Sequence, residues 1–254
     1  MSLDLLSDSV VLLIIAVTFV GAIVKGATNM GLNLLAVPAL APIVGVPTAV
    51  LTIFIAKAVS DVVMLLESRT SKGLRPAKRV VGFLIAGFLG VVLGTFLLAY
   101  LDRNLLFLIL GSLLLLYLGL ETRRRALVIP PAQEKYWAPV AGGLSGVSQG
   151  LTGAAGPTTA IYMLSLDLTP REFVFLTSVI FIAINAGQIA GILYLDLYTK
   201  QRLIYALVAF APVMIGTWIG IRLRGRLSSR GFRNAILILL LLMALNMLRL
   251  GLGF

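Results

Sequence analysis

The chain has 254 residues, of which 59% are hydrophobic and only 12% are charged, and its mean hydropathy is +1.05. Soluble domains carry about 25% charged residues, so this composition indicates a polytopic membrane protein, all α-helical across the bilayer. The absence of Cys and His excludes disulfides, thiolate chemistry and imidazole proton relays, and leaves amides, hydroxyls, backbone groups, Lys, Arg and a few carboxylates for any function.

The first 46 residues predict an external N-terminus followed by a broken helical hairpin. The opening MSLDLLSDS has two Asp and no Lys or Arg, so it lacks the positive start of a signal peptide and is expected to stay outside, uncleaved. Residues 10 to 46 are too long for one crossing of about 20 residues and are interrupted by Gly, Pro and amide residues. We expect this hairpin to add an even number of crossings, because the next span must reach a basic loop inside.

Six plain membrane spans are expected, at residues 47 to 66, 80 to 100, 105 to 120, 173 to 195, 203 to 221 and 234 to 250. Three short loops hold 14 of the 21 basic residues, at 67 to 79, 121 to 136 and 222 to 233. Loops this basic belong on the cytoplasmic side. This topology accounts for the net charge of +11 without nucleic acid, and it places both termini outside a bacterial-type cytoplasmic membrane.

A second broken hairpin is predicted at residues 137 to 168. Two spans already separate the second basic loop from the third, so this segment must add zero or two crossings. It is interrupted in its middle by Gly150, Gly153, Gly156 and Pro157, where a hairpin of two half-helices would turn. A non-helical turn at membrane depth is tolerated only inside protein or beside a cavity.

The two halves of the chain show weak, ordered similarity. Adding 125 or 126 to a residue number superimposes several residues of the first half on the second: Gly21 on Gly146, Gly31 on Gly156, Thr52 on Thr177, Ser60 on Asn185, and the pair Gly90 and Gly94 on Gly216 and Gly220. The similarity predicts an inverted-topology repeat, with residues 1 to 120 as the first repeat, 121 to 136 as a basic linker and 137 to 254 as the second. The Gly pairs favour close helix packing.

Polar residues gather at both hairpin breaks. The candidates for binding are Lys25, Thr28, Asn29 and Asn33 at the first break and Ser145, Ser148, Gln149 and Thr152 at the second. Positive helix N-termini and amide donors favour an anion. The alternative is structural, because small and hydroxyl residues also allow close helix packing without a ligand.

Intramembrane charges are functional candidates by default, and Lys25 and Lys57 are the only basic residues far from a span end. Lys57 has Asp61 four residues on, so the two form a helical pair or Asp61 takes up a proton when the pair opens. Lys25 has no acidic residue within helical reach and is the better candidate to meet a substrate charge. Asn185, with Gln188 on the same span, needs partners from either the hairpin backbone or a ligand.

At both breaks the sequence resembles the TauE/SafE family of sulfite exporters. The matching stretches are GAIVKGATNMGLNLLAVPAL at 21 to 40, GGLSGVSQGLTGAAGPTTAIYML at 142 to 164 and LTSVIFIAINAGQ at 176 to 188. The usual Gly-Gly-Gly run is reduced here to Gly31-Leu32-Asn33. The resemblance implies two similar halves and transport of a small anion containing sulfur or a carboxylate, such as sulfite, sulfoacetate or another organosulfonate.

The leading hypothesis is a secondary transporter that works by alternating access, with coupling to protons through Asp61 as an option. Its two hairpin tips would face each other and form one cradle from Lys25, Asn29, Asn33, Gln149, Thr152 and Asn185. An anion channel is the first alternative. A membrane-embedded enzyme is disfavoured, because no catalytic group set is evident without His, Cys or paired carboxylates. The expected partners are the anion and membrane lipids, with no cofactor and no metal, and a homodimer is left open.

Overall fold

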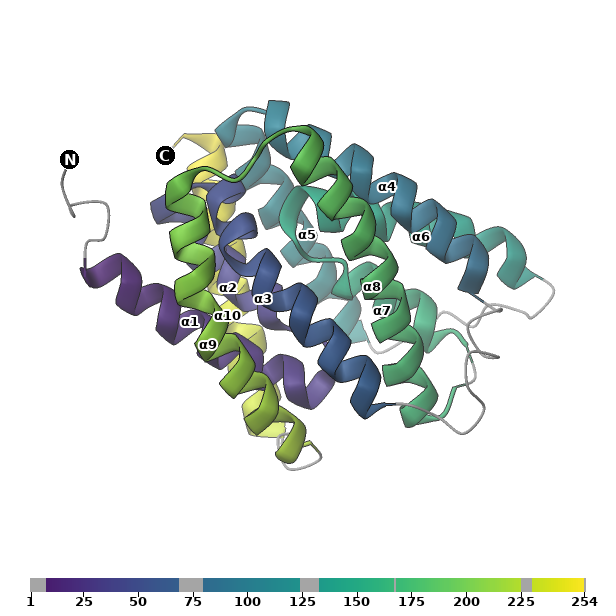
Figure 1. The fold of residues 1–254 in the computed structure, drawn as a ribbon. Helices are drawn as coiled ribbons and strands as arrows, with labels where there is room; N and C mark the ends of the chain where they lie inside the picture. Colours follow the sequence, from purple (N-terminus) through teal and green to yellow (C-terminus); the bar gives the residue numbers. More distant parts are fainter. Residues whose placement is uncertain (1–7, 69–79, 124–132, 167, 225–229, 254) are drawn as a thin grey trace. The chain divides into compact units, whose positions relative to one another are not determined.

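The computed structural model describes residues 8–68, 80–123, 133–166, 168–224 and 230–253 (Figure 1). These described residues form ten helices and no strand, which confirms the prediction of an all-α chain. The helices are α1 Asp8–Thr28, α2 Leu32–Val44, α3 Val46–Glu67, α4 Val81–Tyr100, α5 Arg103–Arg123, α6 Glu134–Thr152, α7 Gly156–Leu164, α8 Pro170–Tyr194, α9 Lys200–Arg222 and α10 Arg230–Leu252.

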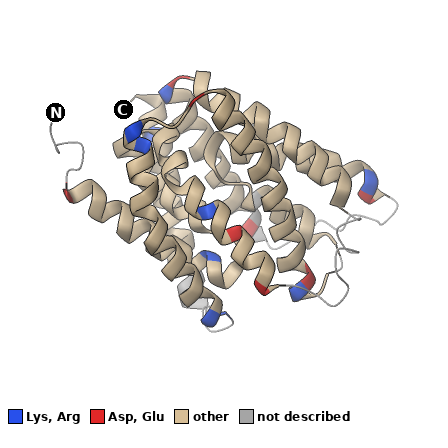
Figure 2. Ribbon diagram, viewed as in Figure 1, with Lys and Arg blue, Asp and Glu red and all other residues tan. Residues whose placement is uncertain are grey.

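Six of the described helices are long and apolar enough to cross a membrane: α1, α3, α4, α8, α9 and α10. Five of them coincide with predicted spans, which supports a multi-pass membrane protein. The sixth predicted span, 105 to 120, lies within α5, whose described apolar part Arg103–Gly119 falls in the shorter class. Most charged residues lie near helix ends, and few interrupt a helix interior (Figure 2).

The arms of the two hairpins are unequal, because α1 has 21 residues and α2 has 13, while α6 has 19 and α7 has 9. With 21 residues α1 is about 31 Å long and can cross the bilayer by itself, because its largely apolar run contains no proline before the left-handed turn at Asn29. Its partner α2 has 13 residues, or about 20 Å, too few for a second straight crossing. The even number of crossings therefore stays a prediction. So does the sidedness of the basic loops, whose residues 69–79, 124–132 and 225–229 lie outside the described part.

The chain divides into two compact units. Unit 1 comprises residues 1–60, 101–122 and 198–254, and unit 2 comprises residues 61–100 and 123–197. Each unit combines helices from both sequence halves: α9 packs on α1 in unit 1, while α4 packs on α6 and α8 in unit 2. The units are thus a different division of the chain from the predicted repeats, which stay a prediction.

Glycines lie at the contact between α4 and α6 and at the contact between α1 and α9. In unit 2, a Cβ atom on Gly90 or Gly94 would collide with the backbone carbonyls of Gly143 and Val147 on α6. In unit 1, a Cβ on Gly216 or Gly220 would collide with the carbonyls of Phe19 and Ile23 on α1. These contacts confirm the packing role expected for the Gly pairs. Residue numbers rise together along each contact, so both helix pairs are parallel.

Candidate functional site

The first break, at residues 29–31 in unit 1, ends α1 through a left-handed backbone turn. Asn29 has φ 64°, and its N–H donates to the Lys25 carbonyl over 2.6 Å. Asn is one of the few side chains that tolerate this conformation. Gly31 follows with φ 113°, and α2 begins at Leu32. The backbone N–H and C=O groups therefore change direction between the last turn of α1 and the start of α2.

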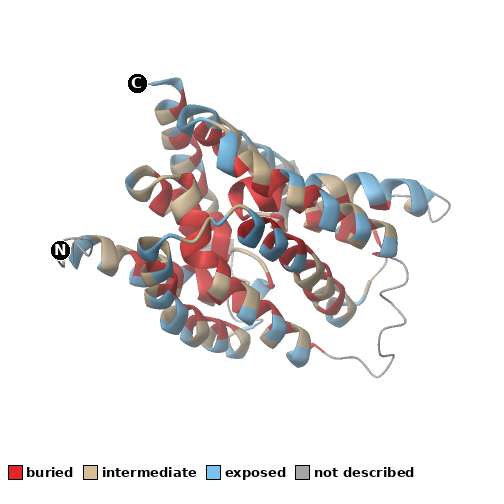
Figure 3. Cartoon of the chain, turned by 45° about the horizontal axis from the view of Figure 1, so that its top comes forward, coloured by how far each residue is buried: buried red, intermediate tan, exposed pale blue. Residues whose placement is uncertain are grey.

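The predicted residues of the first break differ in exposure. Lys25, Asn29 and Asn33 are buried, whereas Thr28 is exposed. The Thr28 hydroxyl donates to the Val24 carbonyl over 2.9 Å and lies 3.2 Å from the Met30 N–H, which donates to it. Burial along α1 increases from its start towards the break (Figure 3). The structure thus gives Thr28 a role in shaping the turn and leaves Lys25 as the buried cation beside it.

The second break, at residues 153–155 in unit 2, has the same construction. Gly153 has φ 71°, and its N–H donates to the Gln149 carbonyl over 2.7 Å. The Thr152 hydroxyl donates to the Ser148 carbonyl over 2.8 Å and accepts from the Ala154 N–H over 3.4 Å. Helix α7 then begins, and one of its first two residues is a proline, whose fixed φ suits the start of a helix. Ser148, Gln149 and Thr152 are all buried.

The hydrogen bonds align the two breaks with an offset of 124 residues. This offset pairs Thr28 with Thr152 and Asn29 with Gly153, and each pair shares the hydrogen bond to the carbonyl four residues earlier, while the Thr28 hydroxyl also lies 2.6 Å from the Met30 carbonyl. The sequence comparison used an offset of 125 because it matched Gly31 with Gly156. The backbone turns at Asn29, two residues before Gly31, and at Gly153, three residues before Gly156. With the offset of 124, Lys25 occupies the position that Gln149 holds in the other break.

A directed chain of hydrogen bonds fixes Gln149 in unit 2. The Ala155 N–H donates to Gln149 Oε1 over 3.1 Å, and Gln149 Nε2 donates to Gln188 Oε1 over 2.9 Å. Both glutamines are buried. Gln188 was noticed in the sequence only as a polar residue on an apolar span, because its partner lies 39 residues away. The chain connects the second break to α8.

Asn185 and Asp61 form a second buried contact in unit 2. Asn185 Nδ2 donates to Asp61 Oδ2 over 2.8 Å, and Asp61 has no exposed surface. The amide therefore finds a carboxylate partner, whereas the sequence suggested the hairpin backbone or a ligand. Lys57 is also buried, and its carbonyl accepts from the Ser60 hydroxyl over 2.7 Å. A direct Lys57 to Asp61 pair stays a prediction.

The predicted site residues fall into two sets. Unit 1 holds Lys25, Thr28, Asn29, Asn33 and Lys57, and unit 2 holds Ser148, Gln149, Thr152, Asn185 and Asp61. Within each set, the residues at the break are neighbours in sequence, and the backbone turn keeps them near one another. The single cradle expected from both sets stays a prediction.

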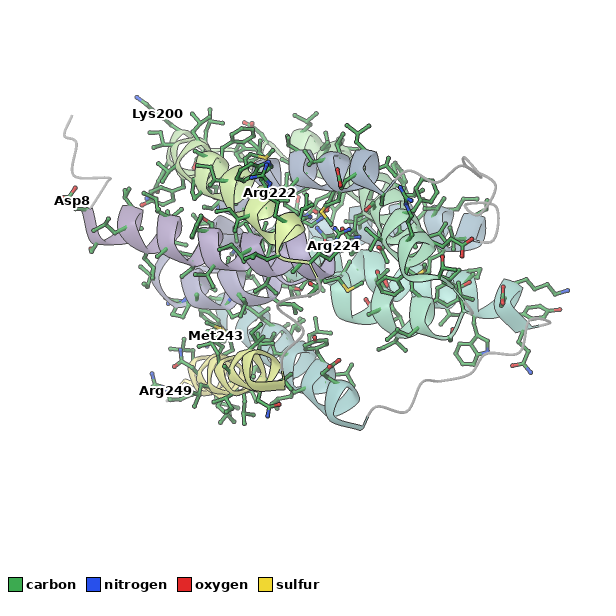
Figure 4. All side chains as sticks on the ribbon, turned by 90° about the horizontal axis from the view of Figure 1, so that it is seen from below. Asp8, Lys200, Arg222, Arg224, Met243 and Arg249 are labelled. Carbon is green, nitrogen blue, oxygen red and sulfur yellow. The ribbon has the colours of Figure 1, made fainter. Side chains whose placement is uncertain are left out.

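Arg224 is a functional candidate that the sequence analysis counted only as a topology signal. Its Nη2 donates to the Gly26 carbonyl in the last turn of α1 over 3.1 Å. Figure 4 labels Arg224 just beyond the end of α9, next to Arg222, whose guanidinium lies 3.4 Å from the Trp218 ring centre. The sequence offered no signal for this contact, because it depends on the parallel packing of α1 and α9.

The starts of the helices differ in how they are capped. Thr169 and Thr199 accept from backbone N–H groups at the starts of α8 and α9, and Thr169 forms a capping box with Glu172. At the breaks, Gly31 before α2 and Ala155 before α7 make no side-chain cap hydrogen bond. Among these four described starts, the two at the breaks lack a side-chain cap, as the start of α6 after Gln133 also does, although Gln149 Oε1 accepts from the Ala155 N–H just before α7.

The model of one protein family, described as sulfite exporter TauE/SafE, matches residues 13–247 of the chain. Comparison with curated proteins and comparison with solved structures gave no match. The matched range includes both breaks and every predicted site residue.

Proposed function

Because the chain belongs to the TauE/SafE family of sulfite exporters, we propose that it is a secondary transporter of a small sulfur-containing anion. Sulfite and organosulfonates are the preferred substrates, and a related small carboxylate is the next. Transport across the cytoplasmic membrane would proceed by alternating access, with both chain termini outside. The family and the six long apolar helices support a membrane transporter.

The observation that carries the choice of an anion is the pair of uncapped helix starts beside buried polar residues. A free helix N-terminus presents backbone N–H groups and the positive end of the helix dipole. At the first break this end lies close in sequence to Lys25, which is 2% exposed. A basic side chain at membrane depth is a functional candidate by default. We assign the main electrostatic attraction for the substrate to Lys25.

The second break supplies neutral groups for the same substrate. We propose Gln149, Thr152 and Ser148 as donors or positioning groups there, and Asn29, Asn33 and Thr28 as their counterparts at the first break. Neutral donors hold an anion more weakly than an ammonium does. A transporter needs that difference, because its substrate must leave as well as enter.

Asp61 is the proposed coupling residue. It is a fully buried carboxylate that accepts a hydrogen bond from Asn185. Protonation of Asp61 would remove a negative charge from unit 2 and weaken this contact, because hydrogen bonds to ionised groups are the stronger ones. Lys57, four residues earlier on α3, is the proposed companion in this charge balance.

Flux of radiolabelled sulfite and sulfoacetate in proteoliposomes tests the proposal. We expect saturable uptake and exchange of one anion for the other by the wild-type chain. Lys25→Ala should abolish it, whereas Lys200→Ala, which alters an exposed residue at the start of α9, should not. Undiminished flux in Lys25→Ala would remove Lys25 from the mechanism. Flux that does not saturate and shows no exchange would favour an anion channel instead.

A further inference from the structure

Gln188 on α8 carries a buried donor for which no described residue supplies an acceptor. The residue has no exposed surface, and its Nε2 makes no hydrogen bond with any described residue. Buried donors without partners are rare in folded proteins, since each loses its hydration without compensation. This atom therefore needs a partner that the described residues do not supply.

The orientation of the Gln188 amide follows from the chain of hydrogen bonds. The Ala155 backbone N–H can only donate, so the Gln149 atom that meets it must be Oε1. Gln149 Nε2 is then the atom that faces Gln188, and the Gln188 atom that receives it must be Oε1. Gln188 Nε2 is consequently turned away from Gln149, at the donor end of the chain. Successive bonds in one direction polarise each other and strengthen this last donor.

Two hydroxyls near the same chain of hydrogen bonds have no hydrogen-bond partner among the described residues. Ser145 Oγ and Thr159 Oγ1 are both fully buried and make no hydrogen bond within the described residues. Ser145 precedes Gln149 by four residues on α6, and Thr159 follows Ala155 by four on α7, so each lies one helical turn from a member of the chain. The unmatched polar atoms of unit 2 thus occur on α6, α7 and α8, the three helices that the chain of hydrogen bonds involves.

We infer that Gln188 Nε2 donates to an oxygen of the transported anion, with Ser145 and Thr159 as further hydroxyl ligands in a neutral subsite of unit 2. The inference rests on the proposed function and adds Gln188 and Thr159 to its binding residues, together with Ser145, which the sequence analysis named as a candidate and the proposed function left without a role. The basic side chains described in unit 2, Lys135 and Arg171, are exposed, so neutral donors carry this subsite. An oxyanion such as sulfite suits it, because each oxygen accepts from amides and hydroxyls.

Isothermal titration of the purified full chain with sulfite tests the inference. Gln188→Met preserves the length of the side chain and removes the donor. We expect it to weaken sulfite binding by about 10-fold to 100-fold, the range for a lost hydrogen bond to a charged group. In proteoliposomes it should raise the half-saturation concentration more than it lowers the maximal flux. The control is Ser178→Ala on the same helix, whose hydroxyl donates to the Val174 carbonyl over 2.8 Å, and it should bind like wild type.

The outcomes separate the inference from the proposed function. Sulfite binding by Gln188→Met within about twofold of wild type would overturn the inference alone, since a buried water would then satisfy Nε2. No binding or flux of sulfite and sulfoacetate by the wild-type chain would overturn the proposed function itself. Where Gln188→Met fails to fold, Gln188→Asn replaces it, because it keeps an amide but draws the donor back by about 1.5 Å. The same loss of affinity is expected of it, and wild-type affinity would overturn the inference.

Discussion

The helix breaks of the two units share a backbone but differ in charge. Both turn through a residue with positive φ whose N–H returns to a carbonyl four residues earlier, and both use a threonine hydroxyl to bind the turn. At the equivalent position the first break has Lys25 and the second has Gln149. The turn therefore depends on the threonine and the left-handed residue. The side chain one turn earlier, Lys25 or Gln149, can differ in charge without changing the turn. In the proposed mechanism, the first break would attract the anion by charge and the second would bind it with neutral donors.

Removing the charge difference should have the largest effect. Lys25→Gln gives the first break the residue of the second and leaves its backbone intact. We expect sulfite flux in proteoliposomes to fall by about 100-fold, because truncating a buried partner of a charge commonly costs about 2–5 kcal/mol. The melting temperature should stay near that of wild type. Flux above about half of the wild-type value would show that the two breaks do not differ in the proposed way.

The coupling prediction concerns unit 2. Asp61→Asn keeps the size of the side chain and an oxygen that can accept from Asn185, but it removes the titrating group. We expect sulfite flux to lose its dependence on an imposed pH gradient while exchange at equal pH persists. Ser60→Ala, on the neighbouring position of α3, is the control and should respond to the gradient as wild type does. A response that survives in Asp61→Asn would exclude this carboxylate as the coupling group.

Helix packing beside the second break gives a smaller effect on stability. Gly146→Ala places a methyl group against the Gly87 backbone of α4 and should destabilise the protein by about 1–3 kcal/mol through overpacking. Gly143→Ala, one turn earlier on α6, meets no atom within 4 Å and should be neutral or stabilising by up to about 1 kcal/mol. Thermal unfolding in detergent would compare them. Equal melting temperatures would contradict the close approach of α4 and α6.

The left-handed residues should show the smallest effect. Gly153→Ala puts a Cβ atom on a residue with φ 71° and should cost about 1–2 kcal/mol, whereas Asn29→Gly at the matching position should be close to neutral. Gly153→Asn reproduces the first break and should be tolerated better than Gly153→Ala. Thermal unfolding would rank the three variants. A Gly153→Ala variant as stable as wild type would show that the second break does not need this turn.

Local features of the chain were predictable from sequence. Glycine, proline and amide residues placed the breaks near Asn29 and Gly153, and uninterrupted apolar runs placed the spans, because both depend on residues adjacent in the chain. The sequence analysis set no boundary between the two arms of the first hairpin, because glycines occur inside α1 as well as at the break. Gly26 in α1 instead contacts α9, where its Cβ would collide with the Thr217 carbonyl.

The contacts that shape the candidate site were beyond the sequence. Asn185 and Asp61 are 124 residues apart, and Gln149 and Gln188 are 39 apart, so their meeting depends on which helices pack together. The repeat pattern did not indicate that α9 packs on α1 and α4 on α6. The repeat pattern also misaligned the breaks by one residue. It matched Gly31 with Gly156, whereas the hydrogen bonds of the two turns match Lys25 with Gln149.

The glycine contacts limit where the protein can change shape. Helices that slide past each other do so by shifting side chains between rotamers, as in shear motions. At the glycines Gly216 and Gly220 between α9 and α1, and Gly90 and Gly94 between α4 and α6, backbone lies against backbone, so these positions have no side-chain rotamers to exchange. We therefore expect each helix pair to move as one rigid body during transport. Bending would then be left to the turns at 29–31 and 153–155, so the expected hinge of each unit and its proposed binding groups would be the same few residues.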